Sequence, residues 1–165
     1  MVLNVGLHAS HSAQPTIEKG NDEVKMQETM KLGIVVSEFN SEVTTKLCES
    51  ALSKCKELGM TLENIILVHV PGAVEIPLIT QKLCQRSDIH AVVCLGAVIR
   101  GETTHFDYVC EQVSYGCQKV ALNYGKPVIF GVLTTEDEAQ ALARISKGAE
   151  CVEAAVKMVE LCEKL

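Results

Sequence analysis

The sequence predicts a single α/β domain, a three-layer α/β/α sandwich of the doubly wound kind with a four-stranded parallel sheet. Three observations lead to this class. Short apolar runs alternate with helical segments from residue 31 onward, and these runs are apolar throughout. At 165 residues and 47% apolar content, the chain fits one compact core. Strands that are apolar on both faces indicate a parallel sheet that helices cover on each side.

The first half of the domain contains two strand and helix pairs. A β-branched run at 31–37 precedes residues 41–58, where apolar side chains recur on one helical face before a glycine. The run at 64–70 repeats the strand signal, and residues 71–85 give a turn and a second helix. Because His69 stands inside this second apolar run, we expect it to be a hydrogen-bonded structural residue.

The second half continues the same alternation. Residues 91–99 predict the third strand, residues 105–124 a third helix that Gly125 closes, and residues 127–133 the fourth strand. A left-handed glycine is a common helix end, so the stop after residue 124 is well marked.

The C-terminal part predicts two more helical segments. Thr135 is the expected N-cap of the first, because Glu138 stands three positions later and completes a capping box. An amphipathic helix then fills residues 148–165. At the other end, residues 1–29 are polar without a sustained period, which predicts a mobile arm before a domain at 30–165.

Composition excludes several classes of function. The net charge of -6 and the lack of a Lys/Arg run argue against nucleic acid or an anionic membrane as a partner. The sequence shows no apolar stretch long enough for a bilayer and no secretory signal at its start. Its eight cysteines form no CxxC pair and fall partly at helical spacing, so we expect core thiols in a reducing cytoplasm, with a plastid as the alternative location. Histidines and cysteines at metal-ligand spacing are also lacking, so no metal is expected.

The segment "RGETTH", residues 100–105, stands where this architecture keeps its ligands, beyond the carboxyl end of a strand. The amides of Gly101, Glu102 and Thr103 can face outward at a helix N-terminus and seat a phosphate. The alternative interpretation is that Thr103 or Thr104 simply caps the helix. The local sequence leaves both interpretations open.

His105 is the candidate for proton transfer, because it shares its predicted loop with acids and hydroxyls. A helix N-terminus favours a neutral imidazole, which is the form that acts as a base. Arg100 or Arg144 would supply the cation that balances a bound anion. Glu75, between two prolines, would orient ligand hydroxyls or tune His105, or else be a surface charge at a helix start.

Two aromatic residues complete the candidate site. Phe39 stands in a loop after the first strand, where its ring can stack on a flat heterocycle. Phe130 stands in the middle of the fourth strand, so the pattern predicts a core residue there.

Four segments, taken in order, resemble the 6,7-dimethyl-8-ribityllumazine synthase family of riboflavin biosynthesis. They are "GIVVSEFN", "VPGAVEIP", "LGAVIRGETTHFDYV" and "PVIFGVLTTEDEAQALAR", and the resemblance covers residues 31 to about 162. It implies a flavodoxin-like sheet and a transferase. The implied reaction condenses a ribitylaminopyrimidine with a phosphorylated four-carbon ketone, without a metal or redox cofactor.

The resemblance also implies roles for individual residues. His105 would move protons, Phe39 would stack on the pyrimidine, and Glu75 would contact the ribityl chain together with Ala73. The backbone of Glu102 and its neighbour Thr103 would bind phosphate. The full set of implied substrate-binding residues is Phe39, Ala73, Glu75, Val98, Ile99, Glu102, Thr103, Phe130, Arg144 and Lys147.

In the family, residues matching Phe130 and Arg144 come from a neighbouring subunit, which implies a homo-oligomer. A pentamer and a sixty-subunit shell both remain open. This chain departs from the family at three places: Glu38 replaces a usually basic residue, Val74 replaces an aromatic, and several residues are missing between Arg144 and Lys147.

Two other interpretations compete with this one. A non-catalytic relative would use the same pocket to bind lumazine or flavin, although the intact "GETTH" favours catalysis. A phospho-receiver module shares the order of strands and helices. It needs an aspartate at the end of a strand, whereas the predicted strands end in Ser37, Val70, Ile99 and Leu133.

Overall fold

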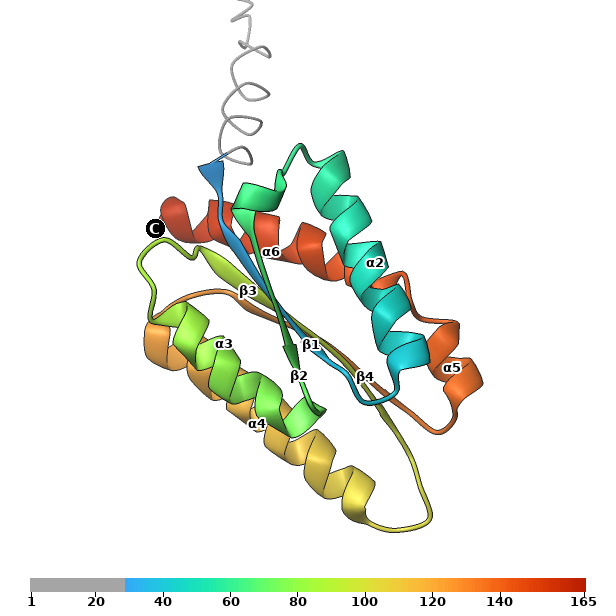
Figure 1. Ribbon diagram of the computed structural model, residues 1–165. Helices are drawn as coiled ribbons and strands as arrows, with labels where there is room; N and C mark the ends of the chain where they lie inside the picture. The colour runs from blue at the N-terminus through green and yellow to red at the C-terminus, as the bar shows by residue number, and fades with distance from the viewer. Residues whose placement is uncertain (1–28) are drawn as a thin grey trace, which may run out of the picture.

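The computed structural model describes residues 29–165, so the arm predicted for residues 1–29 lies outside them except for its last residue. Figure 1 shows a central sheet between two layers of helices. The elements follow one another as β1 (Leu32–Ser37), α2 (Ser41–Glu57), η1 (Leu62–Asn64), β2 (Ile65–Val70), η2 (Ala73–Glu75), α3 (Ile76–Cys84), β3 (Ala91–Ile99), α4 (His105–Tyr124), β4 (Val128–Thr135), α5 (Glu138–Leu142) and α6 (Lys147–Glu163).

The four strands lie in the order β2-β1-β3-β4, and each neighbouring pair is parallel. This is the flavodoxin-like order, in which the chain reverses direction across the sheet after the second strand. Helices α3 and α4 cover one face, while α2, α5 and α6 cover the other (Figure 1). The predicted three-layer α/β/α sandwich is therefore confirmed.

The sheet divides the core into two halves because successive side chains of a strand point to opposite faces. In β1, Leu32, Ile34 and Val36 pack with the α2 and α6 side, whereas Val35 packs with the α3 and α4 side. β3 is buried on both faces in the same way. Both faces of the central strands are thus apolar, which is the pattern that the sequence showed.

Each helical layer contains one close approach between helices at a glycine. Between α3 and α4, a methyl group at Gly116 would come within 2.7 Å of the Pro77 ring. Between α2 and α6, a methyl group at Gly148 would overlap the backbone carbonyl oxygen of Leu47. A side chain at either glycine would therefore push two helices apart.

Two predictions about single residues are wrong because they depend on strand order. β2 and β4 are the edge strands, which apolar runs do not reveal. His69, expected to be a hydrogen-bonded structural residue, is exposed in β2, and none of the side-chain hydrogen bonds within residues 29–165 involves it. Phe130 in β4 is 37% exposed and is not a core residue.

The predicted capping box at Thr135 is also wrong. Thr135 is the buried last residue of β4, where it pairs with Ile99. The N-cap of α5 is Asp137, whose carboxylate accepts a hydrogen bond of 2.7 Å from the Gln140 amide. Aspartate caps a helix as well as threonine does, and the longer strand moves the helix start two residues along. The predicted stop after α4 is confirmed, since Gly125 has φ 59°.

All eight cysteines are free thiols, and six of them are buried, as the core prediction requires. Cys162 is the exposed exception, and Cys110 is intermediate. Burial raises the pKa of Cys55 and of Cys151 to about 11, because a low-dielectric core disfavours the thiolate. Within residues 29–165, no helix has both the length and the apolar character needed to cross a membrane.

Candidate active site

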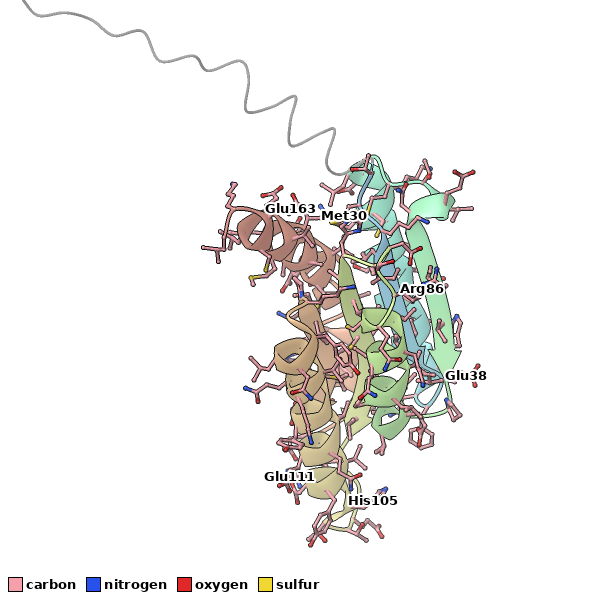
Figure 2. The ribbon with its side chains drawn as sticks, turned by 90° about the vertical axis from the view of Figure 1, so that its left-hand side faces the viewer. Met30, Glu38, Arg86, His105, Glu111 and Glu163 are labelled. Atoms are coloured by element: carbon pink, nitrogen blue, oxygen red, sulfur yellow. The ribbon has the colours of Figure 1, made fainter. Side chains whose placement is uncertain are left out.

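A cavity of about 680 Å³ opens at the carboxyl ends of β1, β2 and β3, on the face that α3 and α4 cover. We call it the His105 cavity. Figure 2 shows His105 at the end of the molecule far from Met30 and Glu163. The cavity is lined by Phe39, Asn40, Gly72, Ala73, Val74, Glu75, Ala97, Val98, Ile99, Gly101, Thr103, His105, Phe106, Val109 and Gln112.

The loop after β1 places an aromatic ring and an amide on one wall. The Phe39 amide donates to the Pro71 carbonyl at 3.1 Å, which fixes the backbone beside β2, while 71% of the residue stays exposed. Asn40 has φ 60° and ψ 48°, a left-handed conformation that asparagine tolerates better than most residues. Its side-chain amide donates to the Ala97 carbonyl at 2.8 Å. The loop is therefore pinned to the end of β3, with the Phe39 ring free to meet a ligand.

The turn after β2 supplies a carboxylate. Ala73 is buried, and Val74 and Glu75 are exposed on the same short helical turn. The Glu75 side chain folds back toward Gly72, so that a methyl group added at Gly72 would lie 2.9 Å from the Glu75 Oε2 atom. Glu75 is also the N-cap residue of α3. Its carboxylate thus stands in the cavity wall as an acceptor for hydroxyl groups.

Residues 100–104 connect β3 to α4 and carry the predicted phosphate seat. Gly101 and Thr103 line the cavity, and a methyl group at Gly101 would meet no described atom within 4 Å. Thr104 is the N-cap residue of α4, and the Thr103 hydroxyl accepts from the His105 amide at 3.4 Å. Open space therefore lies beside the backbone at the N-terminus of a helix of 20 residues, where an anion is favoured.

A second cavity, of about 420 Å³, lies on the α5 and α6 side of the sheet. We call it the Arg144 hollow; it is lined by Val132, Leu133, Thr134, Thr135, Ala143, Arg144, Ser146, Lys147 and Glu150. Arg144 donates to the Gln140 carbonyl at 2.7 Å, and Lys147 contacts the Glu150 carboxylate at 3.2 Å. Two cations therefore gather here, apart from the imidazole.

The structure brings together seven of the residues that the sequence singled out: Phe39, Ala73, Glu75, Val98, Ile99, Thr103 and His105. Glu102, Phe130, Arg144 and Lys147 are missing from the described residues that line the His105 cavity. Sequence reasoning missed Asn40, Gly72, Ala97 and three residues of α4, which are Phe106, Val109 and Gln112. Val109 and Gln112 follow His105 by four and seven positions, so helical spacing was a signal that could have found them.

Comparison with known proteins identifies the family. A model of the family described as 6,7-dimethyl-8-ribityllumazine synthase matches residues 29–163. The chain belongs to this family. It is 52% identical to the 6,7-dimethyl-8-ribityllumazine synthase of Coxiella burnetii (strain CbuG_Q212) over 144 residues, which is 84% of this chain and 95% of the relative. The protein of the same name from strain Dugway 5J108-111 is 51% identical over the same shares.

Two of the departures from the 6,7-dimethyl-8-ribityllumazine synthase pattern lie at the two cavities. Val74, where the family usually has an aromatic, is 39% exposed and lines the His105 cavity. The short connection leaves only four residues between Leu142, the end of α5, and Lys147, the start of α6. Arg144 and Lys147 are therefore held within one turn of each other. Within residues 29–165, no group of three His, Cys, Asp or Glu side chains is placed to hold a metal ion.

Proposed function

We propose that the protein condenses 5-amino-6-(D-ribitylamino)uracil with 3,4-dihydroxy-2-butanone 4-phosphate to give 6,7-dimethyl-8-ribityllumazine, as a transferase of riboflavin biosynthesis. Membership of the family over residues 29–163 is the observation that carries this proposal. The His105 cavity supports it, because one wall offers a flat ring, another a carboxylate, and the third a helix N-terminus beside an imidazole.

The reaction needs no external oxidant or reductant and no cofactor. The pyrimidine amine attacks the ketone carbonyl and releases one water as the imine forms. Loss of a carbon-bound proton then expels the phosphate and leaves an enol, which tautomerises to a new carbonyl. Attack of the ribityl-bearing nitrogen on this carbonyl closes the ring with loss of another water. The balance is therefore two substrates in, and one lumazine, one phosphate and two waters out. Each step moves protons, and none needs a metal.

His105 is the group that we assign to these proton transfers. Its side chain is exposed on the cavity wall, so it can exchange protons with water between steps. A correctly placed imidazole contributes about 10² to 10⁴-fold to such a rate. Holding two substrates in reacting geometry contributes roughly 7 to 11 kcal/mol in favourable cases, so positioning contributes more to the rate than proton transfer does.

The remaining residues bind the substrates in this proposal. Phe39 stacks on the pyrimidine ring, and Glu75 accepts hydrogen bonds from ribityl hydroxyls beside the Ala73 backbone. Val98 and Ile99 form the wall at the end of β3. The phosphate lies against the backbone of Glu102 and its neighbour Thr103, at the start of α4.

We further propose that a second copy of the chain completes each site. Phe130, Arg144 and Lys147 are separated from the His105 cavity within one chain, and both Phe39 and Phe130 leave aromatic surface exposed. A head-to-tail contact would bring the Arg144 hollow of one copy to the His105 cavity of the next. Repetition of that contact closes a ring, either a pentamer or a unit of a sixty-subunit shell. Eight free thiols fit a cytoplasmic location.

The proposal is tested by incubating purified protein with both substrates and following the fluorescence of the lumazine product together with released phosphate. We expect stoichiometric formation of both. Tight binding of flavin with no product would instead indicate a binding protein of the same fold.

A further inference from the structure

Arg100 joins the two ends of the loop that carries the phosphate seat. It directly follows β3, and its backbone amide donates to the Thr135 carbonyl at the end of β4 at 2.9 Å. The loop then runs through residues 101–104 and ends at His105, the first residue of α4. Arg100 is therefore fixed to the sheet at the point where the loop begins.

The Arg100 side chain reaches forward to the far end of the same loop. Its guanidinium Nη2 lies 3.2 Å from the Asp107 carboxylate, and its Cζ lies 4.1 Å from the centre of the Phe106 ring. Phe106 lines the His105 cavity and directly follows His105. One planar side chain thus holds the first turn of α4 by an ion pair and by stacking.

The same guanidinium also contacts the segment that leads to the Arg144 hollow. Its Nε lies 2.9 Å from the Glu136 carboxylate, which follows β4 and precedes the N-cap of α5. Arg100 therefore contacts three segments: the start of α4, the end of β4 and the β4–α5 connection. Both cavities are built on segments that this residue touches.

From this geometry we propose that Arg100 is a positioning residue. It fixes the position of the phosphate-binding loop and of His105 relative to the β4–α5 connection. This inference rests on the proposed function, because it assigns the loop a substrate. It also replaces the expectation that Arg100 itself supplies the cation for the anion. The guanidinium is occupied by two carboxylates and one ring face, and Arg100 is missing from the described residues that line the His105 cavity.

The Asp107 carboxylate, and then that of Glu136, raise the pKa of Arg100 above its usual value, so the residue is charged at every working pH. The three side chains are partly exposed, at 38% for Arg100, 57% for Asp107 and 62% for Glu136. Exposed ion pairs contribute little to global stability, so the network is expected to act on the geometry of the loop and not on folding.

The test uses the full chain in its native assembly with the substitutions Arg100→Gln, Arg100→Lys and Glu136→Gln. Arg86→Gln is the matched control, because Arg86 also binds a carboxylate, that of Asp88 at 3.0 Å, and lies well away from His105 (Figure 2). We expect Arg100→Gln to lower kcat about 10- to 100-fold with a smaller change in either KM. Lysine keeps the charge but loses the planar contacts, so Arg100→Lys should rescue only part of the rate.

Glu136→Gln separates positioning from direct binding of the anion. If Arg100 positions the loop, loss of its partner lowers kcat in the same direction as Arg100→Gln, by several-fold. If Arg100 binds the phosphate, Arg100→Gln raises KM for the phosphorylated ketone at unchanged kcat, and Glu136→Gln frees the cation and lowers that KM. The second pattern, or an Arg100→Gln enzyme that behaves like Arg86→Gln, overturns the inference.

Amide hydrogen exchange gives a readout that does not depend on turnover. In the intact assembly, Arg100→Gln should speed exchange of the amides at residues 103–107, whereas Arg86→Gln should leave them unchanged. Equal exchange in both variants overturns the positioning role. A wild-type protein that makes no lumazine would defeat the proposed function, while the exchange measurement would still decide the role of Arg100.

Discussion

The two cavities at the carboxyl end of the sheet differ in chemistry. The His105 cavity is the larger, with one imidazole, one carboxylate and otherwise mostly apolar or backbone walls. The Arg144 hollow is smaller and holds two cations, one of them paired with Glu150. A condensation that expels phosphate needs both sets of groups. In the proposed reaction, the His105 cavity would supply the imidazole and the Arg144 hollow the cations, so neither cavity of one chain has the full set of groups.

The course of the chain explains this separation. The helices that follow β2 and β3 return along one face of the sheet, whereas α5 and α6 return along the other (Figure 1). Loops that leave strands of the same sheet therefore open to opposite faces. Arg144 and His105 line different cavities for this reason, which is why we propose that a second copy of the chain brings these side chains together.

The largest expected effect comes from removing the imidazole of the His105 cavity. His105→Ala should lower kcat about 10² to 10⁴-fold, because water must then carry out the proton transfers in place of the imidazole. The mass of the native particle should not change, since His105 is an exposed side chain. Steady-state kinetics and native mass measurement check both points, and an unchanged rate would remove His105 from the mechanism.

Arg144→Ala should act on binding and not on proton transfer. Loss of a charged hydrogen-bond donor should raise KM for the phosphorylated ketone about 10- to 100-fold and leave KM for the pyrimidine nearly unchanged. Varying each substrate in turn measures the two constants. Equal losses for both substrates would mean that the Arg144 hollow does not face the phosphate.

A pair of glycine substitutions compares the packing beside each cavity. Gly148→Ala, next to the Arg144 hollow, should destabilise the fold by about 1 to 3 kcal/mol, because its methyl group would overlap the Leu47 carbonyl. Gly101→Ala, in the wall of the His105 cavity, should change stability by less than about 0.5 kcal/mol, because its methyl group meets open space. Urea unfolding checks the difference, and equal losses would contradict it.

The smallest expected effect concerns the thiols. The folded pKa of Cys55 and of Cys151 is about 11, above the ordinary value of 9.0, so burial favours their protonated form. Their contribution to stability is complete below pH 9 and is lost as the pH rises toward 11. At pH 8 an alkylating reagent should modify Cys162 first, because it is the exposed thiol. Mass spectrometry of labelled peptides checks the order, and equally fast labelling of Cys55 would contradict it.

The sequence predicted the helices and strands well because each is encoded by local periodicity and by end signals such as Gly125. Strand order depends on long-range pairing, which no apolar run reveals. His69 and Phe130 were misjudged for this reason, since both stand on edge strands. Thr135 was misjudged because β4 continues two residues beyond the predicted end at residue 133, which leaves Asp137 as the cap.

The site could be predicted in part, because ligands of parallel sheets bind beyond strand ends and the loop motifs mark those ends. The place of Asn40 in the site was not predicted, because its left-handed backbone and its hydrogen bond to Ala97 appear only when β1 and β3 are adjacent. The separation of Arg144 from His105 likewise depends on which face each helix covers. Periodicity along the chain does not carry that information.

The central claim is that His105 and Arg144 of one working site belong to different copies, and mixing two variants tests it directly. His105→Ala and Arg144→Ala chains are refolded together in equal amounts and assayed at a ketone concentration far below the KM of the Arg144→Ala enzyme. Random mixing joins an intact His105 cavity to an intact Arg144 hollow at about a quarter of the contacts, so about a quarter of wild-type activity should return. Activity that stays at the mean of the two separate variants would contradict the claim.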